Sequence, residues 1–339
     1  VRDSVTGEPT GLLFEMGGWL GERMPKPDSQ TLNRYTESAS SSLVAAGVTS
    51  VTDAGRDNIA IRLELYAELV ASCRFLPRPT VMLSPGAGYP DSDRPRGVRT
   101  GATKLAITFS GGEMYPDFDA LVGMMRSAHD SGRQIAVHAV EIEAVAMACE
   151  AFAALGPRSE VARMRHRIEH ASECPPEVAR SIAAAGASVV TQPGFISDRG
   201  DRYLRAWRAG GPTPEHLYAV KTMLEAGLRV AGSSDAPVGP VAPLAGVQAA
   251  VLRASLGGEA VGAEQSISIR QALRLYGTDA AWMGFQEGEL GSIGIGKLAD
   301  LVVLAADPTA VEASEIASIP VLATLIGGEL VHGSLPGLY

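Results

Sequence analysis

The sequence has 339 residues, of which 46% are hydrophobic, so it can bury a large core and disorder is not expected as its main state. A net charge of −9 without long Lys or Arg runs disfavours nucleic acid and membrane surfaces as partners. Three widely separated cysteines, Cys73, Cys149 and Cys174, show no CxxC spacing and favour reduced thiols in a cytoplasmic protein.

The chain begins with Val1 instead of Met. Residues 1–13 show no helix cap, charge pattern or hydrophobic segment typical of a natural start. We therefore expect that upstream sequence is missing, and whether it holds a signal peptide stays open.

From Ser38 onward, short apolar runs rich in β-branched residues alternate with longer segments of helical period. The expected strands cover residues 47–55, 78–84, 102–108, 134–140, 165–171, 187–193 and 228–237, with a later one at 299–305. The expected helices cover residues 116–131, 141–155, 175–185, 214–226 and 268–281, and several begin with Pro and end before Gly.

This alternation predicts an α/β fold with a parallel sheet. Seven strands before the last are one short of the eight that close a (β/α)8 barrel, so we expect a TIM-type barrel without its first strand. Residues 1–285 would form this barrel, strands 2 to 8. Residues 286–339 would form the C-terminal part of a small β-sandwich domain, because strands there are joined without a helix.

Four chemically active residues fall on four different expected strands: Lys104, His138, His170 and Asp235. A charged or imidazole group inside an apolar strand is costly unless it is paired or bound to a metal. In a βα barrel the carboxyl ends of the strands meet at one face, so these residues predict one shared site. Imidazole nitrogens and a carboxylate suit zinc or a similar divalent ion. Lys104 cannot bind a cation as an ammonium, but its carbamate could bridge two metals.

Substrate contacts are expected just after the strand at 187–193. Gln192 and a loop at 195–207 lie there, and Arg202 or Tyr203 could contact a carboxylate or ring of the substrate. Arg56 and Asp57 follow an earlier strand in the same way.

The other histidines do not predict a second metal site. His166 would lie about 13 Å from His170 along one strand, at about 3.3 Å per residue, which is too far to share a metal. His129, His216 and His332 have no ligand spacing to one another and are interpreted as surface residues.

Several motifs occur in a characteristic order: VHA at 137–139, RIEH at 167–170, SSDAPV at 233–238 and GSIGIGKLADLVVLAADP at 291–308. Together they resemble the amidohydrolase family 3 branch of the amidohydrolase superfamily, which includes N-substituted formamide deformylases. The resemblance runs from TGEPTGLL at 6–13 to the C-terminus. It implies a zinc-dependent hydrolase with a distorted (β/α)8 barrel and a small β domain.

The resemblance also implies residue roles. His138 and His170 would bind one metal, Lys104 as a carbamate would bridge, and Asp235 would bind the second metal. A metal-activated hydroxide would cleave a C–N bond of a small amide, N-formyl or N-acyl compound that is not a peptide. Asp235 would take the proton from the water and pass it to the leaving nitrogen.

The HxH motif of the first barrel strand is absent, since no two histidines here are two residues apart. We expect it in the upstream segment. Two alternatives stay open: a Schiff-base lyase that uses Lys104 as an amine nucleophile, and a non-catalytic scaffold protein of the same fold. Assembly with copies of itself is equally open.

Overall fold

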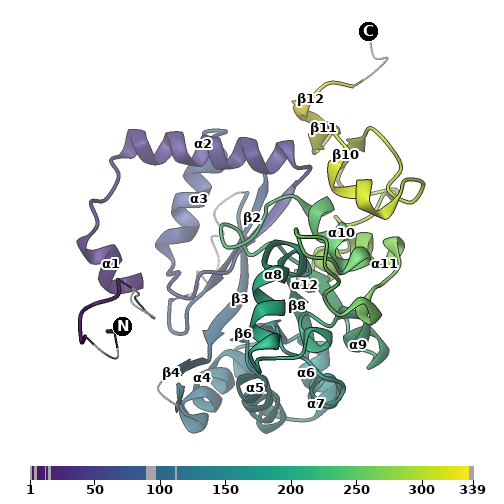
Figure 1. Cartoon of the computed structure of the whole chain (residues 1–339). Helices are drawn as coiled ribbons and strands as arrows, with labels where there is room; N and C mark the ends of the chain where they lie inside the picture. Colours follow the sequence, from purple (N-terminus) through teal and green to yellow (C-terminus); the bar gives the residue numbers. More distant parts are fainter. Residues whose placement is uncertain are drawn as a thin grey trace.

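The computed structural model describes residues 2–3, 6–11, 13, 17–88, 97–110 and 113–335. Within these ranges, the main sheet has seven parallel strands that lie side by side in chain order (Figure 1). They are β1 (Ser50–Asp53), β2 (Arg78–Leu83), β3 (Arg99–Ala106), β6 (Ile135–Ala139), β7 (Arg167–His170), β8 (Ser188–Thr191) and β9 (Val230–Gly232). The sheet curls, with β1 and β9 at its edges, and confirms the predicted TIM-type α/β fold with seven strands.

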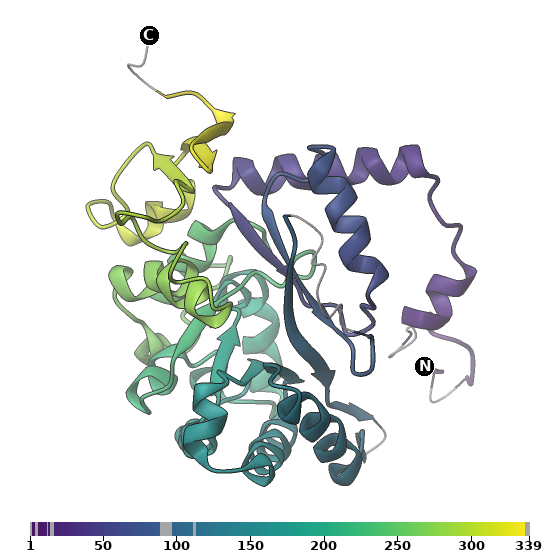
Figure 2. The same ribbon diagram turned by 180° about the vertical axis from the view of Figure 1, so that it is seen from behind.

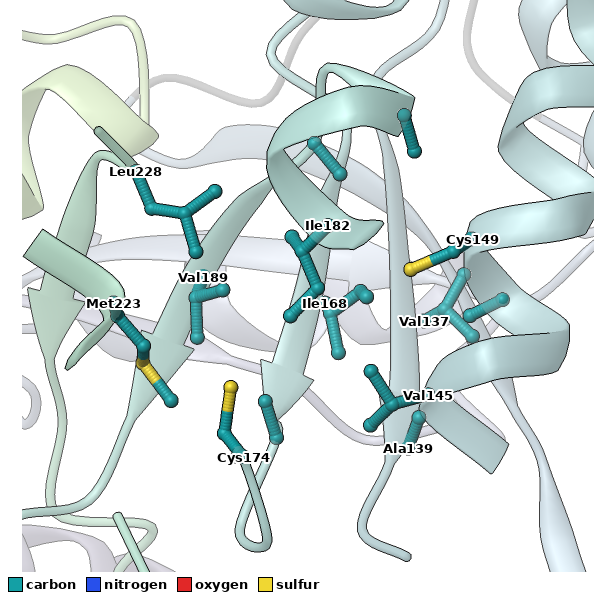
Figure 3. Close-up of a cluster of buried hydrophobic side chains, with 14 of the residues drawn as sticks. Val137, Ala139, Val145, Cys149, Ile168, Cys174, Ile182, Val189, Met223 and Leu228 are labelled. Carbon is teal, nitrogen blue, oxygen red and sulfur yellow. The ribbon is translucent and has the colours of Figure 1, made fainter. Parts of the chain in front are cut away.

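Helices pack on the outer face of this sheet, as the view from behind also shows (Figure 2). Those that contribute to the main core are α4 (Phe118–Asp130), α5 (Ile142–Leu155), α6 (Arg158–Arg163), α7 (Pro176–Ala185), α9 (Val220–Glu225), α10 (Pro243–Leu252) and α11 (Ile269–Tyr276), together with the 3₁₀ helix η3 (Ala313–Ser318). Figure 3 shows this core, where Val137, Ile168 and Val189 of the strands meet Val145 and Ile182 of the helices. Burying such side chains contributes about 1.5–3 kcal/mol each to folding.

The alternation of side chains along β3, β6 and β7 explains how polar groups reach the inside of the curl. Leu105, Val137 and Ile168 point to the outer core. Side chains of a strand alternate between faces, so Lys104 and His138, their chain neighbours, face inward. Across the parallel strands Lys104 is opposite Ala136, and His138 is opposite Glu169. The same register that builds the core therefore gathers charged and imidazole groups on the inner face.

Three sequence predictions of local structure are wrong. Residues 195–207, expected as a loop, lie in helix α8 (Gly194–Arg208), whose many charges hid an apolar face that includes Phe195, Ile196 and Leu204. Residues 214–226 divide into a 3₁₀ turn, η1 (Pro214–His216), and α9, with Tyr218 between them at φ 47°. Residues 268–281 divide into α11 and α12 (Thr278–Met283) because Gly277 leaves the helical conformation.

The prediction that His129 is a surface residue is also wrong. It is only 9% exposed, because the last turn of α4 presents it to the loop before β7. A single polar residue near a helix end gives no periodic signal of the face it occupies.

A second, antiparallel sheet contains β10 (Leu301–Leu304), β11 (Val321–Ile326) and β12 (Glu329–Gly333). It lies beside α2 (Ser29–Ala45), whose Val44 carbonyl accepts a hydrogen bond of 2.7 Å from Thr324 Oγ1. Arg78 of the main sheet donates two hydrogen bonds, of 2.8 and 3.0 Å, to the buried carboxylate of Asp300. Such bidentate pairing fixes the orientation of the two sheets.

Helix α3 (Ile61–Ala71) packs its buried Leu63 against Val81 and Leu83 of β2. The remaining described elements are α1 (Gly17–Arg23), the hairpin of β4 (Thr108–Ser110) and β5 (Glu113–Tyr115), and η2 (Ala263–Gln265). Among the described helices, none combines the length and the apolar character needed to cross a membrane.

Candidate active site

His138 and His170 lie against each other at the carboxyl ends of β6 and β7. Their ring centroids are 4.5 Å apart and their planes are inclined by 74°. Burial, with His170 and Lys104 nearby, lowers the pKa of His138 to about 3, so its imidazole is neutral and can offer a lone pair. Within the described part of the chain, neither nitrogen of His138 has a hydrogen-bond partner.

His170 reaches this position through an unusual backbone conformation. By strand alternation it would follow Ile168 into the outer core, but His170 and Ala171 adopt the left-handed region at φ 78° and 43°. Each such non-glycine residue costs about 1–2 kcal/mol. The turn is held by hydrogen bonds from Ala171 N–H to the Ala139 carbonyl, at 3.0 Å, and from Tyr218 N–H to the Ser172 carbonyl, at 2.8 Å. Strain that the surrounding structure enforces is typical of functional sites.

Arg253 supports the segment that holds this turn, and the sequence analysis did not predict its role. It is 1% exposed and donates hydrogen bonds to the carbonyls of Pro214, Leu217 and Tyr218, at 2.9–3.2 Å, as well as to residues 261 and 262. Burial lowers the pKa of Arg253 to about 10, which leaves the guanidinium charged at neutral pH. A buried arginine that satisfies only carbonyls has no sequence signature, because its partners are backbone atoms of a distant segment.

Lys104 lies deeper inside the curl, beside a buried ion pair. Its residue exposure is 5%, and burial lowers the pKa of its amine, although Glu169 acts in the opposite direction. Arg167 Nε donates a 2.7 Å hydrogen bond to Glu169 Oε1, and both side chains are 7% exposed. Burial opposes ionisation of Glu169, but Arg167 and Lys104 together lower the pKa of this carboxyl. Arg167 and Glu169 belong to the RIEH motif, and their alternate spacing in a strand was the signal that could have placed them inward.

Asp235 follows β9 in a tight loop and also adopts a left-handed conformation, at φ 52°. Its carbonyl accepts a 2.8 Å hydrogen bond from Val238 N–H, and Arg199 of α8 donates one of 2.7 Å to the Val238 carbonyl. The negative charge of Asp235 raises the pKa of the Lys104 amine, in opposition to the effect of burial. Two of the four predicted site residues thus contact each other, while Lys104 acts on the pKa of His138 and Asp235 acts on that of Lys104.

The expected substrate contacts divide between buried and exposed positions. Gln192 is 2% exposed and hydrogen-bonds His170 and Ser233. Arg202 is exposed on α8. Tyr203 is half-buried, with its hydroxyl 3.4 Å from that of Tyr218. Arg56 affects the pKa of His138, which places its charge near the histidine pair.

The donor set fits a divalent metal in part. The histidine pair offers imidazole nitrogens, with the His138 ring neutral and the His170 ring oriented by a side-chain amide. Among the described residues, no group of three or more His, Cys, Asp and Glu lies close enough to hold a metal. The histidine pair therefore offers two nitrogen donors, and among the described residues no third His, Cys, Asp or Glu lies close enough to join them.

A second histidine pair lies at the opposite ends of the same strands. His166, 0% exposed, accepts a 3.0 Å hydrogen bond at Nδ1 from Ile135 N–H, and its Nε2 lies 2.9 Å from His129 Nδ1. His129 Nε2 in turn lies 3.7 Å from Glu160 Oε1. Three of the four ring nitrogens of this pair thus have a hydrogen-bond partner in the protein, and His129 Nε2 lies near a carboxylate.

Fold and site define a (β/α) barrel protein with a polar centre at the carboxyl ends of its strands. The amidohydrolase family model matches residues 1–332, and the chain belongs to this family. The chain is 26% identical to YtcJ of Bacillus subtilis (strain 168), which is named as an amidohydrolase, over 98% of this chain and 67% of that protein. It is 31% identical to the N-substituted formamide deformylase of Arthrobacter pascens, over 59% of this chain and 36% of that protein.

Solved structures show the same fold. An uncharacterised metal-dependent hydrolase from Pyrococcus furiosus superposes with a TM-score of 0.68 at 24% identity, covering 86% of this chain and 63% of that one. The Aspergillus niger ochratoxinase superposes with a TM-score of 0.63 at 16% identity, covering 91% and 77%. The chain thus spans about two thirds of YtcJ and of the Pyrococcus protein.

Proposed function

We propose that this protein is a metal-dependent hydrolase that cleaves the C–N bond of a small amide, N-formyl or N-acyl compound. The observation that carries the proposal is the contact between His170 and the neutral His138 imidazole, which has no hydrogen-bond partner in the described part of the chain, at the face where such sites lie. Family membership supports it, as do relatives named as a formamide deformylase and as a metal-dependent hydrolase.

The residues that would hold a divalent ion, zinc in our proposal, are His138, His170, Asp235 and Lys104 as its carbamate. A bound ion of this kind polarises a carbonyl and lowers the pKa of water toward about 7. Asp235 would accept the proton that the attacking water releases as its oxygen bonds to the carbonyl carbon. Asp235 would then give that proton to the nitrogen as the C–N bond breaks, so that an acid and an amine leave.

Other residues of the chain prepare this chemistry. The left-handed conformation of His170 brings its ring against His138, and Asp235 adopts the same conformation in the loop after β9. Arg56 carries a positive charge toward the same face and could bind an acidic substrate group. The three free cysteines agree with our proposal of a cytoplasmic location.

The test is hydrolysis of a panel of N-formyl and N-acyl amines by the zinc-loaded full chain. The reaction is measured by the amount of amine released. We expect Asp235→Asn to lose about 10²–10⁴-fold in rate, the usual contribution of a general acid–base group. Asp307→Asn is the control, because Asp307 is exposed and only caps a turn at Thr309. A panel without any turnover, or full activity of Asp235→Asn, would overturn the proposal.

One observation favours a second function. Lys104 is a buried amine on a barrel strand, as in enzymes that form a Schiff base with a carbonyl substrate. Borohydride reduction in the presence of small aldehydes and ketones would attach the carbonyl compound covalently to Lys104. Such an adduct, in a protein that binds no zinc, would favour the lyase over the hydrolase.

A further inference from the structure

Gln192 connects the two strained parts of the site. It follows β8 directly and is 2% exposed. Its Oε1 lies 2.9 Å from His170 Nδ1, and its Nε2 donates a 2.9 Å hydrogen bond to Ser233 Oγ. Ser233 precedes Asp235 by two residues, and its N–H donates to the Thr191 carbonyl at 2.9 Å. One side chain therefore links the end of β7 to the loop after β9.

The chemistry of the amide determines the state of His170. An amide oxygen only accepts hydrogen bonds, so His170 Nδ1 must carry the hydrogen. In a neutral imidazole the lone pair then lies on Nε2, the nitrogen on the far side of the ring from Gln192. The opposite tautomer would require the amide to turn over, with its NH₂ group toward Nδ1.

The same geometry argues against a contact between Gln192 and substrate. Both polar atoms of the amide bind protein groups, and almost none of the side chain is exposed. The expectation that Gln192 binds substrate, which followed from its place after a strand, is better replaced by a role through His170.

We propose that Gln192 is a positioning residue that fixes His170 as the Nδ1–H tautomer, with Nε2 free for a ligand, and ties this ring to the Asp235 loop through Ser233. The proposal rests on the proposed function for the identity of that ligand. The tautomer itself is a property of the metal-free chain, so the two can fail separately.

The experiment uses full chain labelled with ¹⁵N-histidine and kept free of metal at alkaline pH, where imidazoles are neutral. Long-range ¹H–¹⁵N correlation identifies the protonated nitrogen of each ring, and the His170 signals are assigned by their loss in His170→Gln. We expect Nδ1–H for His170 in the wild type. Gln192→Leu should shift His170 to a mixture or to Nε2–H, and Gln192→Glu, which keeps an acceptor, should restore Nδ1–H.

Gln134→Leu is the matched control. Gln134 is another partly buried amide, and it donates to the carbonyls of Arg165 and Met283 at 2.7 and 3.0 Å. Its loss should leave the His170 tautomer unchanged. The proposal is overturned if wild-type His170 is Nε2–H, if Gln192→Leu keeps Nδ1–H, or if Gln192→Glu abolishes it.

Zinc affinity, measured by competition with a chelator, gives the second readout. We expect Gln192→Leu to weaken it about 10–100-fold, as for other groups that orient metal-binding histidines, with Gln192→Glu close to the wild type. Equal zinc affinity of the wild type and Gln192→Leu would contradict the positioning role. If the wild type binds no zinc but shows the expected tautomers, the proposed function is contradicted, whereas the role of Gln192 in fixing the His170 tautomer is supported.

Discussion

Two histidine pairs lie at opposite ends of β6 and β7 and differ in what their nitrogens contact. At the amino ends, the centroids of the His129 and His166 rings lie 5.2 Å apart, and the rings are hydrogen-bonded to each other. His166 also accepts a hydrogen bond from the Ile135 N–H, and His129 lies 3.7 Å from the Glu160 carboxylate. At the carboxyl ends, His138 has no hydrogen-bond partner in the described part of the chain. Three of the four nitrogens of the amino-end pair are hydrogen-bonded to protein groups, against one of four, His170 Nδ1, at the carboxyl ends in the described part of the chain.

This difference separates a structural histidine pair from one that is prepared for a ligand. The His138 ring is half-buried, and its neutral imidazole has a lone pair that is available to a ligand. Backbone conformation points the same way. His170 is held in the left-handed region, at φ 78°, whereas His166 is not among the residues with positive φ. Arg165, directly before His166, is also left-handed, at φ 53°, so the pairs differ in that only the carboxyl-end pair contains a left-handed histidine.

The largest expected effect separates the two pairs by metal affinity. His138→Ala should weaken zinc binding about a thousandfold or more, because it removes a ligand and not only an orienting group. His129→Ala should leave zinc affinity unchanged, since its nitrogens face protein groups. Chelator competition on both variants provides the comparison, and similar losses in the two would mean that the pairs do not differ as described.

A smaller effect concerns the ion pair that lies between the two ends of the strands. Glu169→Gln leaves the buried Arg167 guanidinium without its carboxylate and should destabilise the fold by about 3 kcal/mol. Adding Arg167→Met should recover part of this loss, since the unpaired Arg167 charge is then removed as well. Urea unfolding of the single and double variants measures both values. A double variant less stable than Glu169→Gln would show that Arg167 acts mainly through its 3.0 Å hydrogen bond to the Met283 carbonyl.

The smallest effect is a pH dependence of the amino-end pair. Burial, with His129 and Arg163 nearby, lowers the pKa of His166 to about 3 from 6.5. As the pH falls below 6.5, His166 becomes protonated in the unfolded chain, but in the folded chain it stays neutral until about pH 3. The free energy of unfolding therefore decreases as the pH falls through this window. At about pH 4.5 the loss should be roughly 2 kcal/mol.

His166→Gln should remove that part of the acid sensitivity. His166 contacts His129, the Ile135 N–H and the Phe152 ring, which is stacked on it at a centroid distance of 5.7 Å. The charged groups around this pair are Glu160, which lies near His129, and Arg163. Urea unfolding at about pH 7 and about pH 4.5 in both proteins gives the comparison. An equal decrease in the wild type and His166→Gln would contradict the assignment to His166.

The sequence predicted the parallel sheet because periodic apolar runs report directly on which faces are buried. All seven strand segments occur near their expected positions. Helix α8 was missed because its charged residues obscure a packed face, on which Gly200 lies so close to Ser255 that a Cβ would approach to 2.6 Å. Such close approach depends on a segment more than fifty residues away, which no local pattern reveals.

For the site, the sequence indicated which strands carry chemistry but not how side chains turn. His170 has the alternation of an outward residue, and only its left-handed conformation brings it against His138. The roles of Gln192 and Arg253 depend on contacts between segments far apart in the chain. His129 was misplaced for the same reason, because its partner, His166, lies 37 residues away.

The most direct test of this account is a zinc titration of the ¹⁵N-histidine-labelled full chain, followed through the imidazole nitrogens. We predict that one nitrogen of His138 and Nε2 of His170 shift on binding, while His129 and His166 keep their metal-free signals. Shifts at His129 and His166, or a titration in which no imidazole nitrogen responds, would contradict the central claim that the carboxyl-end pair is the metal site.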